Sequence, residues 1–277
     1  MHRDRLFSTV KTLYPEGIAR RKQDMQRHRG QYIVPGPNFI WSIDGHLKFA
    51  FCGIEIYAAI DAYSQYIPRF YCGISGRTSV SVAKQYLEVL REVGKQPRFL
   101  RSDRGTKTMM CANTHWQLSR SHDPEKDFKD CFMYGTSTAN QRIEAWWSQL
   151  NKGQLVIWRV SCCYLDLTIS KLIIIQDYFE ELRNLNQLSD SIADQIACLA
   201  IYILILRTVT HGFIRLWNKH TIRRQKNQPN LPVGKPYMLY HYPEAGVTDF
   251  AIEPDKGLLE TLDESMKEYG LFCQHFI

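Results

Sequence analysis

The sequence predicts an α/β fold in which a single mixed sheet is covered by helices. The turn-rich stretch VPGPN, residues 34–38, separates a helix-permissive arm from strand-like sequence, because each proline biases its predecessor away from helix. Three strand-like runs follow before the apolar spacing becomes helical. The resulting order of strands and helices is typical of a layered α/β structure.

The first half of the chain supplies the predicted sheet. Strands are expected at FIWSID, EIYAAIDA and QYIPRFYCGI, and Pro68 indicates that the third lies at an edge or a bulge. The stretch SVSVAKQYLEVLREVGK has one apolar helical face, with Ser79 as the expected cap and Gly94 as the stop. PRFLRSD predicts a further strand.

Two more helices are expected after that strand. Residues 106–120 have a helical pattern, and residues 121–137 are expected to form a polar loop ending in Gly135. In TSTANQRIEAWWSQLNK, Thr138 and Gln141 have the spacing of a capping box. Ile143, Trp147 and Leu150 would form one apolar helix face, with Glu144 on its edge.

We divide the chain into a basic arm (1–36), a core (37–154), a helical extension (155–217) and an extended tail (218–277). The apolar, β-branched segment 155–176 continues an amphipathic helix poorly, and we interpret it as an insertion or a gene-model artefact. The run IACLAIYILIL, 196–206, is shorter than the roughly 20 residues that span a bilayer, so we expect a buried helix and no membrane association.

Composition favours a globular protein inside the cell. Hydrophobic residues make up 44% of the chain and charged residues 23%, which is ordinary for a packed domain. The charged N-terminus has no apolar signal region, so secretion is not expected. We expect a nuclear or cytoplasmic location. The eight cysteines form no CxxC pair, which indicates reduced thiols.

Three acids are the candidate catalytic and metal-binding residues: Asp44, Asp103 and Glu144. A carboxylate inside a strand is costly unless it is paired or binds a cation. Three carboxylates gathered on one side of a sheet would suit two Mg²⁺ or Mn²⁺ ions rather than zinc. Such a pair of ions can promote displacement at a phosphodiester.

Each acid also has a simpler interpretation. Asp44 with Gly45 could form a hairpin turn, Asp103 could cap a loop, and Glu144 could be a solvated helix residue. His46 and His122 are expected to be polar loop residues rather than ligands.

The motifs WSIDGH, RSDRGT and NQRIEAWW resemble the three acidic signatures of the integrase catalytic core, the Asp-Asp-Glu superfamily of retroviral and retrotransposon integrases. The likeness to stand-alone eukaryotic integrase-core proteins extends from about residue 34 to 152. Between the acids lie 58 and 40 residues, a compatible spacing. The resemblance implies a ribonuclease H-like, five-stranded sheet flanked by helices and two metal ions held by the three acids.

The resemblance has exceptions. Asp61 falls on a strand position that is not a ligand in this family, so we expect a structural role. The family's N-terminal zinc module needs paired His and paired Cys, and the sequence before Asp44 does not supply them.

DNA is the expected partner. The formal charge is +7, and lysines and arginines that neutralise phosphates supply most sequence-independent affinity. The candidate contacts lie in two basic clusters and beside the acids: Arg20, Arg21, Lys22, Arg27, Arg29, Lys107, Gln141, Arg142, Arg223, Arg224 and Lys226. Trp146, rather than the core-facing Trp147, is expected to be free to stack on bases.

The leading hypothesis is a mobile-element-derived polynucleotidyl transferase that cleaves or joins DNA with two Mg²⁺ ions, without a small-molecule substrate. A catalytically silent DNA-binding or scaffolding protein of the same fold is the alternative. A ribonuclease H-type nuclease is a third reading, although the extra acid of such sites is not identified here. The resemblance to integrases also allows a homo-oligomer.

Overall fold

The computed structural model describes residues 12–16, 33–46, 53–74, 76, 78–103, 105–135, 140–161, 181–189, 191–225 and 229–268. The chain divides into two compact units. One comprises Met1–Val34 with Arg224–Leu231, and the other comprises Pro35–Arg223 with Pro232–Ile277. The sheet and all the helices that cover it belong to the second unit. The predicted boundaries at 36, 154 and 217 stay a prediction.

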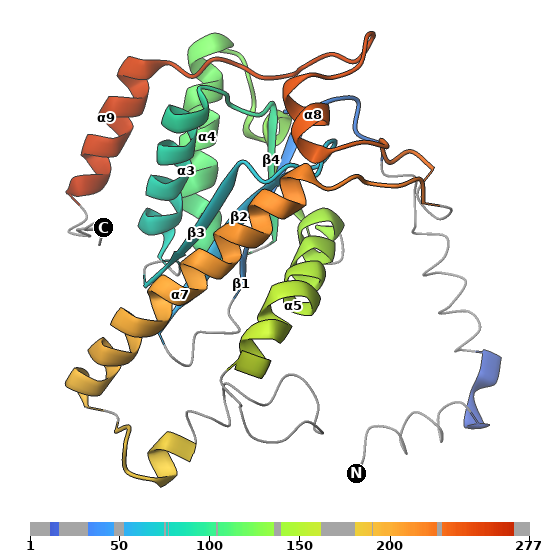
Figure 1. The fold of residues 1–277 in the computed structure, drawn as a ribbon. Coiled ribbons are helices and arrows are strands. Elements are labelled where there is room, and N and C mark those ends of the chain that lie inside the picture. Colours follow the sequence, from blue (N-terminus) through green and yellow to red (C-terminus); the bar gives the residue numbers. More distant parts are fainter. Residues whose placement is uncertain are drawn as a thin grey trace. The chain divides into compact units, whose positions relative to one another are not determined.

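The second unit contains a five-stranded mixed sheet (Figure 1). Its strands are β1 (Ile40–His46), β2 (Glu55–Asp61), β3 (Arg69–Gly73), β4 (Phe99–Asp103) and β5 (Phe132–Gly135), in the order β3-β2-β1-β4-β5. The pairs β1–β2 and β2–β3 are antiparallel, whereas β1–β4 and β4–β5 are parallel. This confirms the mixed α/β sheet and the ribonuclease H-like fold class.

The sequence located four of the five strands. Pro68 directly precedes β3, which is an edge strand as expected. The prediction of a polar loop at 121–137 is wrong, because this segment contains a 3₁₀ turn (Phe128–Asp130) and then β5. Strand β5 has only four residues, and pairing with β4 defines it. A partner strand distant in sequence is invisible to a local pattern.

The N-cap of helix α3 (Ser79–Val93) lies one residue before the expected position. Thr78, not Ser79, is the cap, since its side chain accepts a hydrogen bond from Ser81 N. The Ser79 hydroxyl instead accepts a bond from Met110 N, 2.9 Å away. Gly94 ends the helix in the left-handed conformation at φ 66°, as predicted.

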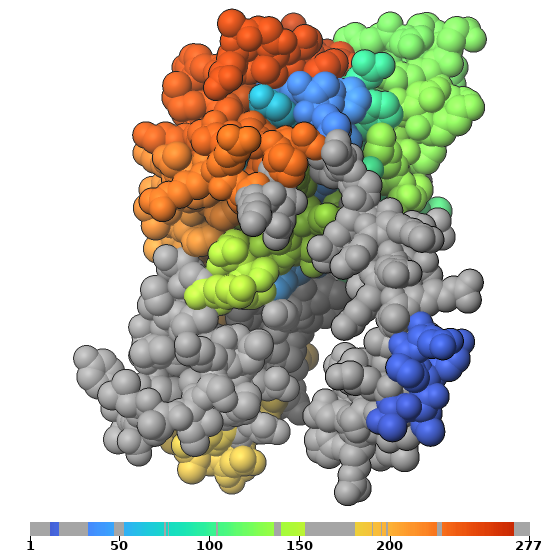
Figure 2. All heavy atoms as spheres, turned by 90° about the vertical axis from the view of Figure 1, so that its right-hand side faces the viewer, coloured from blue at the N-terminus to red at the C-terminus, as the bar shows by residue number. Residues whose placement is uncertain are grey.

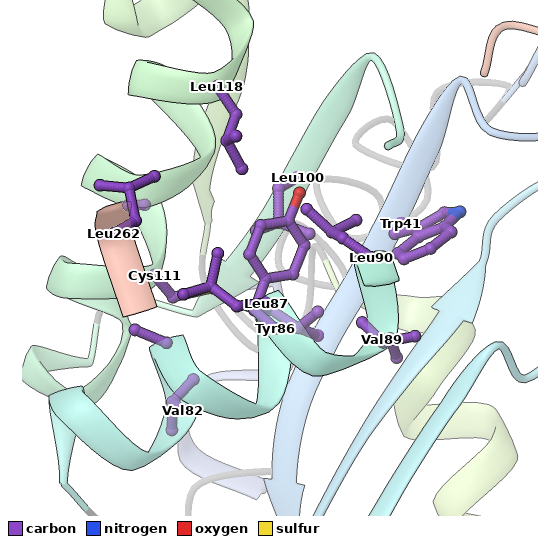
Figure 3. Packing of buried hydrophobic residues seen from close by; sticks show 14 of the residues in the cluster. Trp41, Val82, Tyr86, Leu87, Val89, Leu90, Leu100, Cys111, Leu118 and Leu262 are labelled. Carbon is purple, nitrogen blue, oxygen red and sulfur yellow. The ribbon is translucent and has the colours of Figure 1, made fainter. Parts of the chain in front are cut away.

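One face of the sheet is covered by α3 and α4 (Met109–His122), and α9 (Lys256–Lys267) packs on these two helices. Leu87, Leu90 and Leu100 are fully buried between these layers, and Figure 3 shows their side chains interdigitating with Trp41 and Leu262. Among the described residues, this apolar layer is the larger of the two cores that flank the sheet.

The C-terminal segment is part of that core. The expectation of an extended tail is wrong, because it contains α8 (Pro236–His241) and α9. Tyr240 of α8 is fully buried, and Leu259 and Met266 of α9 are 2% and 3% exposed. The proline and glycine content of this region suggested loops. Packing against α3 and α4 stabilises α9, whereas Tyr240 of α8 is held by a hydrogen bond to Asn38 and by stacking on Tyr66.

The opposite face is covered by α5 (Gln141–Ser161) and α7 (Ile192–Lys219). The sequence predicted a short buried helix at 196–206, but α7 has 28 residues and Ile196 and Ile201 are 60% and 57% exposed. By length and composition it is the one helix among the described residues that could cross a membrane. Its C-terminal half packs on the sheet, where Arg207 Nε donates to Cys72 O at 2.7 Å.

Asp61 has the structural role that the sequence predicted. It is fully buried at the end of β2 and accepts hydrogen bonds from Asn38 N and from the backbone and hydroxyl of Ser64, at 2.8, 2.8 and 2.6 Å. Burial raises the pKa of Asp61 to about 6, although these hydrogen bonds act to lower it. The VPGPN turn is thereby tied to the end of β2.

Candidate active site

Asp44 lies within β1 rather than in a hairpin turn. Its backbone pairs with Ala58 of β2, and the strand continues to His46, so the turn interpretation is wrong. Gly45 packs directly on Tyr57, where a Cβ would come within 3.1 Å of the ring. The glycine therefore allows the strand to carry an acid on one face and a close aromatic contact on the other.

Asp103 is the last residue of β4, the strand that pairs with β1 in parallel. Ser42 lies beside Arg101 in this pairing, so two residues further on Asp44 and Asp103 stand at the same level. Side chains alternate between the faces of a strand. Ile43 and Leu100 face the α3 side, and hence both aspartates face the α5 side.

Glu144 lies in the first turn of α5, on that same side, and is exposed. Its backbone N–H donates to Asn140 O, while the Asn140 side chain donates to Ile43 O at 3.1 Å and fixes the start of the helix against β1. Thr138, the expected capping residue, lies outside the described residues. Since the helix begins at Gln141, that residue cannot be the third position of a capping box.

The acids affect one another electrostatically. Burial raises the pKa of Asp44 to about 6, and the negative charges of Glu144 and Asp103 add to this rise. Hydrogen bonds from the Trp147 side chain and the Gly45 backbone act in the opposite direction. Asp44 therefore feels the negative charge of both other acids, and a bound cation would relieve this repulsion.

Trp147 binds Asp44 directly. Its indole Nε1 donates to Asp44 Oδ2 at 2.9 Å, and its ring stacks on His46 with a centroid separation of 4.8 Å. His46 is 6% exposed at the end of β1, so placing it in a polar loop was wrong. The other residue expected in a loop, His122, is the last residue of α4. The sequence assigned Trp147 only to the core, and nothing in its spacing indicated the bond to Asp44.

Trp146 is not free to stack on bases. It is fully buried, in contact with Phe70 and Phe213, and Trp147 is 3% exposed. Helix α5 packs on β1 and β2 beside α7. Its apolar face is wide enough to bury two adjacent tryptophans, which corrects the expectation from spacing alone.

The donor chemistry suits a hard divalent cation. Carboxylate oxygens from two neighbouring strands and a facing helix are ligands that Mg²⁺ and Mn²⁺ prefer. Among the residues that the structure describes, no three His, Cys, Asp or Glu side chains are grouped closely enough to hold one ion. The donor type and its placement on one face fit the ions, and a complete ligand cluster is not formed.

The predicted nucleic-acid contacts fall into two sets. Lys107 is half-buried in the 3₁₀ turn (Thr106–Thr108) that follows Asp103, and Gln141 and Arg142 precede Glu144 on α5. Figure 2 shows that part of α5 (lime green) reaches the surface. Arg223 and Arg224 are exposed after α7. The remaining candidates, Arg20, Arg21, Lys22, Arg27, Arg29 and Lys226, lie outside the described residues.

A ribonuclease H-like sheet with acids on adjacent strands and on the facing helix defines the class of polynucleotidyl-transferase-like folds. Comparison with protein families matches residues 31–241 to the integrase core domain. This match covers most of the chain, which therefore belongs to the integrase core domain family. A comparison with curated proteins finds no match. Family membership points to nucleic acid as the substrate class and to divalent metals as the usual cofactors.

Proposed function

We propose that the protein is a metal-dependent DNA strand transferase or endonuclease in which Asp44, Asp103 and Glu144 hold two Mg²⁺ or Mn²⁺ ions. The observation that carries the proposal is the placement of Asp44 and Asp103 at the same level of adjacent strands, with Glu144 on the facing helix, in an integrase core where both charges act on Asp44. Negative side chains that destabilise one another remain in a folded protein when a ligand compensates for them.

The chain's own residues would perform three tasks. The three carboxylates would fix the cations, which when bound activate a water or a DNA hydroxyl and stabilise the leaving oxygen. Lys107, Gln141 and Arg142 would orient phosphates next to the acids. The partly buried position of Asp44 would limit solvent around the reacting phosphate.

The location and partners of the protein follow from this function. We propose DNA as the substrate, without a small molecule, and action in the nucleus or cytoplasm. The exposed Arg223 and Arg224, with the basic arm before residue 37, would add phosphate contacts away from the acids.

The test is a strand-transfer and nicking assay on duplex oligonucleotides with Mn²⁺. Asp103→Asn should lower the rate at least about 100-fold, because a lost ligand removes several kcal/mol of transition-state stabilisation. Asp123→Asn, at the exposed end of α4, is the matched control and should keep the wild-type rate.

Two results would contradict the proposal. Equal activity in wild type and Asp103→Asn would place catalysis elsewhere. DNA binding by the wild type with no turnover in Mg²⁺ or Mn²⁺ would instead support the catalytically silent protein.

A further inference from the structure

Asn140, just before α5, and three residues of α5 form one stripe facing β1. Asn140, Glu144, Trp147 and Asn151 recur at intervals of four, three and four residues, which places them on the same side of a helix. The first of them donates to Ile43 O, as described above. Glu144 follows one turn later, and its negative charge raises the pKa of Asp44.

The second half of the stripe binds the end of β1. Trp147 Nε1 donates to Asp44 Oδ2 at 2.9 Å, and His46 Nε2 donates to Asn151 Oδ1 at 3.2 Å. Two residues along a strand cover about 6.7 Å, and four along a helix rise about 6 Å. The two bonds therefore match in spacing, and a slip of one residue in the strand would break both.

The orientation of the Trp147 indole is strongly constrained. The side chain is 3% exposed, and the ring lies nearly parallel to His46, at 14°. A buried N–H without a partner costs about 1–3 kcal/mol, so the bond to Asp44 favours the carboxylate orientation that reaches the indole. An ionised carboxylate has about four acceptor positions, and one bond to Oδ2 leaves others for a cation.

We propose that Trp147 is a positioning residue that holds Asp44, and with it the spacing between Asp44 and Glu144, in the orientation needed for cation binding. This inference rests on the proposed function, since it assigns Trp147 to the support of that site. Groups that hydrogen-bond to metal ligands commonly alter metal affinity by about 10–100-fold when removed.

The adjacent tryptophan provides a matched control. Trp146 is also buried, but its Nε1 has no hydrogen-bond partner among the described residues. Trp147→Phe and Trp146→Phe therefore remove the same atoms from neighbouring positions, and only the first removes a bond to Asp44. In Trp147→Phe the remaining ring can still stack on His46.

The experiment measures Mn²⁺ affinity directly, by electron paramagnetic resonance of the free ion, in the full chain without DNA. Trp147→Phe should bind Mn²⁺ about 10-fold more weakly than the wild type, whereas Trp146→Phe should match it. If Trp147→Phe does not fold, benzothienylalanine at position 147, which replaces the N–H by sulfur at nearly constant shape, tests the same bond.

The outcomes are distinguishable. If the wild type binds Mn²⁺ and both phenylalanine variants bind it equally well, this inference is overturned and the proposed function stands. If the wild type binds no Mn²⁺, the proposed function fails and the inference fails with it. As a readout independent of metal, the ¹⁵N indole resonance of Trp147 should shift in Asp44→Asn while that of Trp146 does not.

Discussion

The two faces of the sheet use the same strands for different purposes. On the face toward α3, α4 and α9, β1 contributes Trp41 and Ile43 to an apolar core. On the face toward α5, the same strand contributes Asp44 and His46. Alternation along one strand thus separates a layer that stabilises the fold from a layer that carries charge, and substitutions on the two faces should have separable effects.

The largest expected effect is a loss of activity from the α5 face. Glu144→Gln should reduce DNA strand transfer in Mn²⁺ at least about 100-fold, because it removes a proposed ligand charge. Glu144 is exposed, so the unfolding midpoint should stay within error. Glu92→Gln, exposed on α3, is the matched control; similar activity in the two variants would erase the distinction between the faces.

The next effect is a loss of stability from the α3 face. Leu87→Ala, at a side chain with no exposed surface, should lower the free energy of unfolding by about 2–5 kcal/mol. Leu216→Ala on α7, where the side chain is 64% exposed, should change it by less than about 0.5 kcal/mol. Urea denaturation measures the free energy of unfolding of both variants. A loss in Leu87→Ala as small as that in Leu216→Ala would show that Leu87 is not in a tightly packed core.

The α3 face should also make stability depend on pH through His115. Burial lowers the pKa of this histidine from 6.5 to about 3, and its Nδ1 is hydrogen-bonded to the Tyr86 hydroxyl at 2.6 Å. As pH falls below 6.5, the unfolded chain binds a proton that the folded protein does not, so stability decreases toward acid.

The variant His115→Asn isolates this effect, because an amide oxygen can accept the Tyr86 bond without titrating. Between pH 7 and 5 the wild type should lose about 2 kcal/mol more stability than the variant. Urea unfolding at the two pH values measures the difference. Parallel pH profiles would indicate that His115 titrates normally in the folded protein.

The smallest effect is a gain in stability on the α5 face. Gly212 lies inside α7, and a Cβ there would meet no atom within 4 Å. Gly212→Ala should raise the free energy of unfolding by about 1 kcal/mol, the usual difference in helix propensity, and leave strand transfer unchanged. A decrease in the thermal midpoint would mean that the helix needs the glycine for a close contact.

Local sequence patterns predicted what depends on neighbouring residues. The alternation in β1, the apolar spacing of α3 with Gly94 as its end, and the three acidic motifs were all readable along the chain. The strand and the helix involve residues a few positions apart, where geometry follows directly from the period of the element. The structural role of Asp61 was expected instead from the resemblance to the integrase core, in which its strand position is not a ligand.

Only the tertiary structure decided the features that depend on distant partners. Strand β5 exists through its pairing with β4, and α9 through its burial against α3 and α4. The same dependence placed Trp146 in the core and Trp147 on Asp44, across 103 positions of sequence. The local sequence pattern predicts which face of a helix or strand a side chain lies on. Which group that side chain contacts is determined only when distant segments pack together.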